Sequence, residues 1–183
     1  MGGGEGETEP AEHAAIRGTI THRIIETLWH DGELPETERI ATALAAEGMN
    51  PDTATVVAQE IADEVAACQK EPFFQWLLDR TGPDGESEYA IDAVKLPGVI
   101  QTGILDFVKQ EGDRWWIVDF KTSRYGAGQA KAEFLKEQVE YYRPQLIAYQ
   151  AMLARAKGVD IAQIRVGLYF TSLQQWHEIT RNH

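Results

Sequence analysis

The chain has 183 residues, of which 43% are hydrophobic and 25% charged, so it can bury a full core without a disulfide or zinc staple. Its single cysteine, Cys68, excludes a disulfide framework, a cysteine-rich zinc module and a four-cysteine iron–sulfur cluster. No apolar run reaches the roughly 18 residues of a membrane span and no signal peptide is recognisable, so we expect a cytoplasmic protein with no membrane partner.

The net charge of -12 is unevenly distributed along the chain. Residues 1–120 hold 8 Lys and Arg against 24 Asp and Glu, whereas residues 121–165 hold 8 against 4. This asymmetry permits a basic face on an acidic protein. Solvated charged surfaces are nevertheless the commoner cause of such a pattern.

The N-terminal half is predicted to be mostly helical. Residues 1–11 are rich in Gly and Glu and lack apolar periodicity, which predicts a disordered tail ahead of a single domain over residues 12–183. Beyond the tail, apolar residues recur at helical spacing, and Asn50-Pro51 is a strong helix start. The predicted helices cover residues 12–29, residues 36–47, a long run from residue 51, and residues 73–78 after Pro72.

The C-terminal half adds a sheet. Turn-forming residues at 81–87 mark the change from helical to strand periodicity. The predicted strands are residues 88–94, 100–109, 115–122, 164–170 and 176–179, with a hairpin connection at 110–113. A loop over 125–130 and a helix over 132–157 precede the fourth strand. The order of elements predicts one α/β domain.

Two neighbouring strands carry acids in apolar surroundings. Asp119 and Lys121 are two residues apart, so both side chains should leave the same face of the sheet. Taken alone, such a pair is more often an ordinary surface salt bridge at the end of a strand. Asp106 lies among apolar residues, and a short hairpin would place it beside Asp119. A buried acid is costly unless it is paired, protonated or bound to a cation. Two acids with a nearby lysine suit a hard divalent cation.

Two helical pairs complete the pattern. His22 and Glu26 are four residues apart on one helical face, as are Gln145 and Tyr149. Taken alone, the first pair reads as an exposed or partly buried His–Glu contact. The second reads as polar decoration of a helix.

Taken in chain order, these blocks resemble the nuclease domain at the C-terminus of RecB- and AddA-type helicase–nucleases, a branch of the PD-(D/E)XK superfamily. Each block is weak alone, but four in this order are specific. The blocks are Gly18 with His22 and Glu26, then Gly103-Ile104-Leu105-Asp106, then Asp119-Phe120-Lys121-Thr122, and finally Gln145-Leu146 with Tyr149. The resemblance implies a restriction-endonuclease-like α/β core, in which helices flank a central mixed sheet.

The resemblance also implies the roles of individual residues. His22, Asp106, Asp119 and the carbonyl of Phe120 would bind Mg²⁺, with Mn²⁺ as a substitute, and Lys121 would be the catalytic lysine. The sequence does not decide whether that lysine orients water or stabilises the transition state.

Further site residues follow from the resemblance and from the charge pattern. Glu88 lies where many relatives carry a catalytic acid, although Glu86 is close enough to leave that assignment open. Gln145 and Tyr149 would contact DNA or brace the site. A basic groove beside the metal would add Arg124, Lys131, Lys136 and Arg143, unless these side chains are surface charges paired with Glu133, Glu137 and Glu140.

The implied function is that of a metal-dependent DNA exonuclease acting on single-stranded ends in double-strand-break repair or recombination, beside a helicase domain or subunit. The chain has no Walker-type phosphate loop of its own, so a motor would have to be supplied elsewhere, and the glycine-led start suggests an excised domain. A catalytically silent module that binds DNA or a helicase, and a stand-alone nuclease, are the alternatives. DNA against RNA preference and cleavage polarity stay open.

Overall fold

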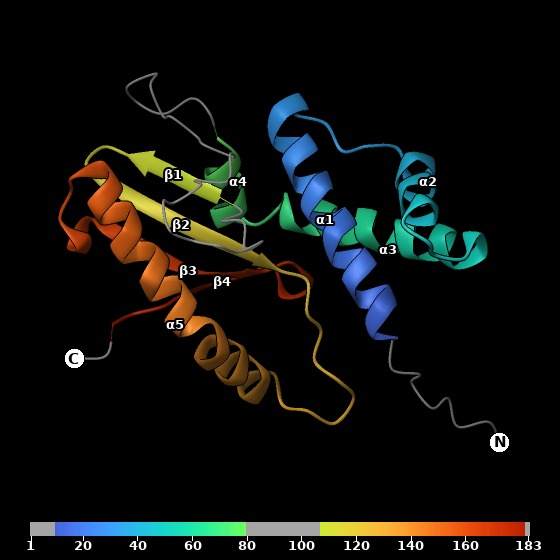
Figure 1. Cartoon of the computed structure of the whole chain (residues 1–183). Coiled ribbons are helices and arrows are strands. Elements are labelled where there is room, and N and C mark those ends of the chain that lie inside the picture. The colour runs from blue at the N-terminus through green and yellow to red at the C-terminus, as the bar shows by residue number, and fades with distance from the viewer. Residues whose placement is uncertain (1–9, 80–106, 182–183) are drawn as a thin grey trace. The chain divides into compact units, whose positions relative to one another are not determined.

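The computed structural model describes residues 10–79 and 107–181 (Figure 1). The predicted turn at 81–87 and strand at 88–94 lie outside the described residues, as does the part of the next predicted strand before Phe107. The chain divides into two compact units, Met1–Ala67 with Thr122–Lys136 and Cys68–Lys121 with Glu137–His183, and each is described by itself. Within the described ranges, no helix is both long enough and apolar enough to cross a membrane.

Three helices form most of the first unit, in agreement with the helical N-terminal half predicted from the sequence. They are α1 (Ala11–Asp31), α2 (Thr37–Ala46) and α3 (Pro51–Cys68). Helix α1 ends at Gly32, whose φ of 75° suits glycine and whose N–H donates to the Leu28 carbonyl at 2.9 Å. Helix α3 begins after Asn50, whose side chain accepts the Asp52 N–H at 2.9 Å, as its capping sequence predicted.

The core of the first unit is built from one apolar stripe on each helix. Ile20 and Leu28 of α1, Leu44 of α2, and Ile61 and Val65 of α3 are all at most 3% exposed. This spacing follows the helical repeat, so burial of the stripes, rather than local propensity, holds the three helices together.

The second unit contains a four-stranded mixed sheet in the order β1-β2-β3-β4. The outer pairs are antiparallel and the central pair β2–β3 is parallel, which confirms the predicted α/β class with a mixed sheet. The strands are β1 (Phe107–Glu111), β2 (Arg114–Lys121), β3 (Ile164–Phe170) and β4 (Gln175–Glu178). A parallel pair needs a crossover, and α5 (Lys131–Lys157) provides it.

The hairpin between β1 and β2 is tighter than predicted. Gln110 and Glu111 continue the ladder, pairing with Trp115 and Arg114, so the connection is Gly112-Asp113 rather than residues 110–113. Gly112 has a φ of 59°, which fits the first position of a two-residue hairpin turn. Gln110 and Glu111 were not predicted to belong to the strand because both are polar.

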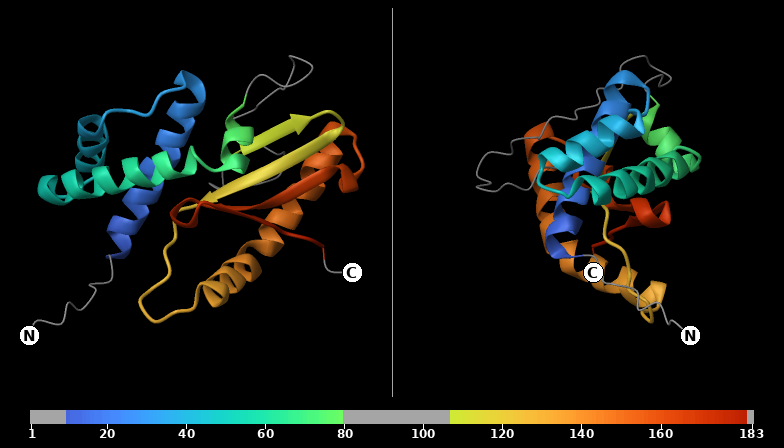
Figure 2. Two further views of the ribbon diagram at one scale, coloured as in Figure 1. Left: turned by 180° about the vertical axis from the view of Figure 1, so that it is seen from behind. Right: turned by 90° about the vertical axis from the view of Figure 1, so that its right-hand side faces the viewer.

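Helices cover both faces of this sheet (Figures 1 and 2). The short helix α4 (Pro72–Leu78) begins at Glu71, whose carboxylate accepts the N–H groups of Phe73 and Phe74, each at 3.0 Å. The ring of Trp76 in α4 contacts Trp116 at 4.8 Å between centroids. On the other face, Lys157 of α5 lies over the ring of Trp115. Alternate residues of β2 therefore face alternate helices.

Candidate active site

The C-terminal end of β2 holds an acid and a lysine in direct contact. Asp119 and Lys121 are separated by one residue, and strand alternation sends both side chains to the face that α5 covers. The Lys121 Nζ lies 3.0 Å from the Asp119 Oδ2, and the two side chains are 17% and 12% exposed. The structure therefore brings these two predicted site residues together.

The burial of Asp119 requires a compensating charge. The neighbouring residues Val118 and Phe120 are at most 2% exposed, and Asp119, counted as a whole residue with its backbone, is 8% exposed. An unpaired carboxylate in such a position is costly, and the adjacent ammonium offsets much of that cost. The Phe120 ring contacts the rings of Phe107 and Tyr169. A phenyl ring has no ligand atom, so any metal contact of Phe120 would be through its backbone carbonyl.

A tyrosine from α5 covers the lysine. The Lys121 Nζ lies 3.7 Å from the ring centroid of Tyr142, close enough for a cation–π contact. The exposed neighbour Tyr141 meets the Tyr142 ring edge to face at 4.8 Å. Sequence reasoning assigned no role to Tyr142. The sequence signal that could have identified Tyr142 is its position three residues, about one helical turn, before Gln145.

Gln145 and Tyr149 form a pair on the same helix. The Gln145 Nε2 donates to the Tyr149 hydroxyl at 2.8 Å, and Tyr149 is 7% exposed. Tyr142, Gln145 and Tyr149 recur at three- and four-residue intervals, so they lie along one stripe of α5. This stripe starts at the residue that touches Lys121.

His22 lies on α1 in the first unit, where it is half-buried, and Glu26 one turn later is exposed. It belongs to a different unit from Asp119, so the two are described separately. Asp106, Glu88 and Glu86 lie outside the described residues. Within the part of the chain that the structure describes, no three His, Cys, Asp or Glu side chains gather as a metal site.

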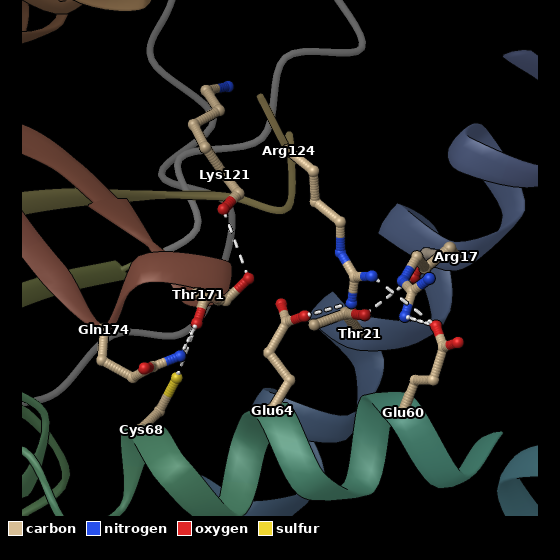
Figure 3. Close-up of polar contacts among 9 residues, drawn as sticks. All are labelled: Arg17, Thr21, Glu60, Glu64, Cys68, Lys121, Arg124, Thr171 and Gln174. Atoms are coloured by element: carbon tan, nitrogen blue, oxygen red, sulfur yellow. Dashed lines mark hydrogen bonds and ion pairs between the residues drawn. The ribbon is translucent and has the colours of Figure 1, made fainter. Parts of the chain in front are cut away.

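Both arginines that were expected to contact DNA have acidic partners. In the first unit, Arg124 pairs with Glu64 at 2.7 Å and with Glu60 at 3.6 Å, both on α3 (Figure 3). In the second unit, Arg143 pairs with Glu140 at 3.1 Å and donates to the Thr180 carbonyl at 2.6 Å. The structure thus contains the Glu140 pairing that the sequence offered as the alternative to a basic groove.

The Arg124 network includes a buried arginine that sequence reasoning missed. Arg17 on α1 is 4% exposed and shares the Glu60 carboxylate, at 2.6 Å (Figure 3). One residue later, a Cβ on Gly18 would lie 3.1 Å from the Thr122 Oγ1. Arg17 and Arg124 therefore share the Glu60 carboxylate of α3, and Gly18 of α1 leaves room for Thr122, the residue after Lys121. No pattern in the sequence marks these charges as partners.

The backbone of the lysine is also anchored within the second unit. The Thr171 hydroxyl donates to the Lys121 carbonyl at 3.3 Å (Figure 3). The Thr171 carbonyl in turn accepts the Cys68 thiol at 3.4 Å and the Gln174 amide at 2.6 Å. Thr171 and Cys68 are fully buried, so this chain of hydrogen bonds fixes the strand end that carries Lys121.

Comparison with known protein families gives a match. The family profile described as the PD-(D/E)XK nuclease superfamily matches residues 2–182, almost the whole chain. A search of curated proteins found no match. The acid–any residue–lysine order in the family's description is the order of Asp119, Phe120 and Lys121 in β2.

Proposed function

This chain belongs to the PD-(D/E)XK nuclease superfamily, and from that we propose that it is a metal-dependent DNA exonuclease of the RecB/AddA type. The observation that carries the proposal is the contact between Asp119 and Lys121 at the end of β2. Hydrolysis of a phosphodiester needs neutralisation of the phosphate charge and a nucleophile near neutral pH. A buried carboxylate beside an ammonium suits both tasks.

Asp119 supplies a hard oxygen donor of the kind that Mg²⁺ takes, so the described part of the site fits such an ion. We assign His22, Asp106 and the Phe120 carbonyl as its other ligands on the family resemblance, with Mn²⁺ as a substitute. Phe107 pairs with Val118, the residue before Asp119, and Asp106 precedes Phe107 in the sequence but lies outside the described residues. A bound ion would neutralise phosphate charge and lower the pKa of a water.

Lys121 would act on the reacting groups directly. Its ammonium has three donors and no acceptor, so it can orient the attacking water or stabilise the charge that develops on phosphate oxygens. Its 3.0 Å contact with Asp119 keeps it beside the carboxylate that would hold the ion. Glu88 would complete the acidic set on the family resemblance.

DNA contacts are proposed for residues of α5 and of the loop before it. Gln145 and Tyr149 are hydrogen-bonded to each other, so each would help to position the other against the DNA strand being cleaved. Arg143 and Arg124 would contact phosphates only by exchanging their present acidic partners for DNA. Because the chain has a net charge of -12, we propose that a helicase domain or subunit delivers single-stranded ends to it during break repair or recombination.

The test is cleavage of end-labelled linear and circular single-stranded DNA, with Mg²⁺ and with a chelator. We expect degradation of the linear strand only, in Mg²⁺ only, and none with Asp119→Asn. Cleavage of circles would replace the exonuclease assignment with an endonuclease. Wild-type protein that cleaves neither substrate in Mg²⁺ or Mn²⁺ would favour the silent DNA- or helicase-binding module instead.

A further inference from the structure

Tyr142 makes a contact with the proposed catalytic lysine that differs in kind from the one made by Asp119. The lysine ammonium lies 3.7 Å from the centroid of the Tyr142 ring and 3.0 Å from the Asp119 carboxylate. The carboxylate neutralises the ammonium that it holds. An aromatic face attracts the ammonium through its quadrupole and leaves the positive charge intact.

Asp119 and Tyr142 also differ in the other interactions that each is expected to make. If the proposed function is correct, Asp119 shares its negative charge with a metal ion and can no longer be the only group that holds Lys121. Tyr142 offers no charge to a metal ion or to a phosphate. Its ring is carried by α5, the helix that packs on this face of the sheet, and it makes a T-shaped contact with the ring of Tyr141.

We propose that Tyr142 is a positioning residue that keeps the Lys121 ammonium directed at the reaction centre through its ring face, and that its hydroxyl is dispensable for this. This inference rests on the proposed nuclease function for its consequence, but the contact itself can be measured without any cleavage. Phenylalanine should therefore replace Tyr142, whereas an aliphatic side chain should not.

The first readout is spectroscopic. An aromatic face shifts the resonances of protons above it upfield, so the ε-methylene signal of Lys121 in protein with ¹³C-labelled lysine should be upfield of those of exposed lysines. Loss of one signal in Lys121→Met assigns it. The shift should persist in Tyr142→Phe and disappear in Tyr142→Leu. Lys157 of α5 lies over the ring of Trp115 of β2. Its signal should not move when Tyr142 is changed, so it is the internal control.

The second readout is kinetic. Tyr142→Leu should lower kcat by about tenfold with little change in KM, because a desolvated cation–π contact is of that order, and Tyr142→Phe should restore the rate. Lys157→Gln removes the other cation–π contact between α5 and β2 and is the control for a general loosening of the helix. If such loosening is not what slows Tyr142→Leu, Lys157→Gln should leave kcat within about twofold of wild type. Should Tyr142→Leu fail to fold, Tyr142→Met is the second non-aromatic variant.

Several results would overturn the inference. A Lys121 signal at the exposed-lysine position in the wild-type protein would show that the ring contact is absent. A loss of rate in Tyr142→Phe equal to that in Tyr142→Leu would assign the role to the hydroxyl. An upfield signal in a wild-type chain that cleaves no DNA would instead overturn the proposed function and leave the contact standing.

Discussion

At the scale of single residues, Asp119 and Lys121 are paired but are assigned different tasks, metal binding for the carboxylate and action on the reacting groups for the ammonium. The carboxylate can bind a metal ion, whereas an ammonium has no lone pair to offer one. The two side chains lie on one strand face at 3.0 Å, so removal of either leaves the other partly buried without its partner. The consequences for metal binding should nevertheless differ.

We expect Asp119→Ala to abolish both metal binding and cleavage, and Lys121→Ala to abolish cleavage while metal affinity stays within a few-fold of wild type. Calorimetric titration with Mn²⁺ measures the affinity without DNA. If Lys121→Ala lost metal affinity as fully as Asp119→Ala, the assigned division between ligand and catalytic lysine would be wrong.

Lys109 is a second lysine of this sheet, and its environment makes stability depend on pH. It is 3% exposed, donates to the carbonyls of Trp76 and Asp79 at the end of α4, and lies over the Trp76 ring. Burial lowers its pKa from 10.5 to about 8, against the opposing charges of Glu111 and Asp79. Between these two values the unfolded chain binds more protons than the folded one, so this group makes stability rise with pH.

The expected outcome is that the free energy of unfolding of Lys109→Met, measured by denaturant titration, lacks part of the increase that wild type shows between pH 8 and 10. Measurements should stop near pH 10, because burial also raises the pKa of Tyr169 and that group acts in the opposite direction above this value. Identical pH slopes in both proteins would show that Lys109 titrates normally.

At the scale of elements, the packing of β3 against β4 depends on one glycine. Gly167 pairs with Glu178, and a Cβ at this position would collide with the His177 carbonyl and lie 2.7 Å from the Trp176 ring. A backbone oxygen cannot move aside as a flexible side chain can. A side chain at this position would therefore force the backbone of β4 to shift relative to β3.

Gly167→Ala should destabilise the chain by about 1–3 kcal/mol, in the range of overpacked cores, as measured by chemical denaturation. Gly126→Ala is the matched control, because nothing lies within 4 Å of the Cβ that it would add. A Gly167→Ala protein as stable as the control would mean that β4 shifts freely along β3.

The elements also show what periodicity could and could not predict. Apolar spacing placed the helices and the strand over residues 164–170, because burial of one face imposes a repeat on the sequence. It missed Gln110 and Glu111 in the hairpin, where the strand runs into solvent and no longer needs apolar residues. The Asp-Phe-Lys spacing predicted the shared face, since alternation is a property of the backbone alone.

Contacts between distant segments were beyond such reasoning. Arg17 pairs with Glu60 and Arg124 with Glu64 across 43 and 60 residues, and Tyr142 reaches Lys121 from another element. Each of these residues is unremarkable in its own neighbourhood of the sequence. Tertiary packing alone selects the partner, so charge counting suggested a basic groove where the structure has ion pairs at Arg124 and Arg143.

At the scale of the whole molecule, the acidic charge limits how strongly the chain can bind DNA by itself. Phosphate neutralisation supplies most non-specific affinity, and the net charge is -12. We expect fluorescence anisotropy to give weaker than micromolar affinity for single-stranded DNA at physiological salt, in a chelator to prevent cleavage. Arg143→Ala with Lys136→Ala should weaken it further. Sub-micromolar binding would contradict delivery by a helicase.

We propose that Asp119 and Lys121 of this superfamily domain catalyse metal-dependent cleavage of DNA. The most direct measurement is the rate of cleavage of a linear single-stranded DNA in Mg²⁺ by wild type, Lys121→Met and Lys157→Met, because each variant removes a lysine that lies over an aromatic ring between α5 and β2. We expect a loss of at least about 100-fold for Lys121→Met, the size expected for a lost transition-state contact, and a near wild-type rate for Lys157→Met. Equal rates in wild type and Lys121→Met would show that Lys121 is not catalytic.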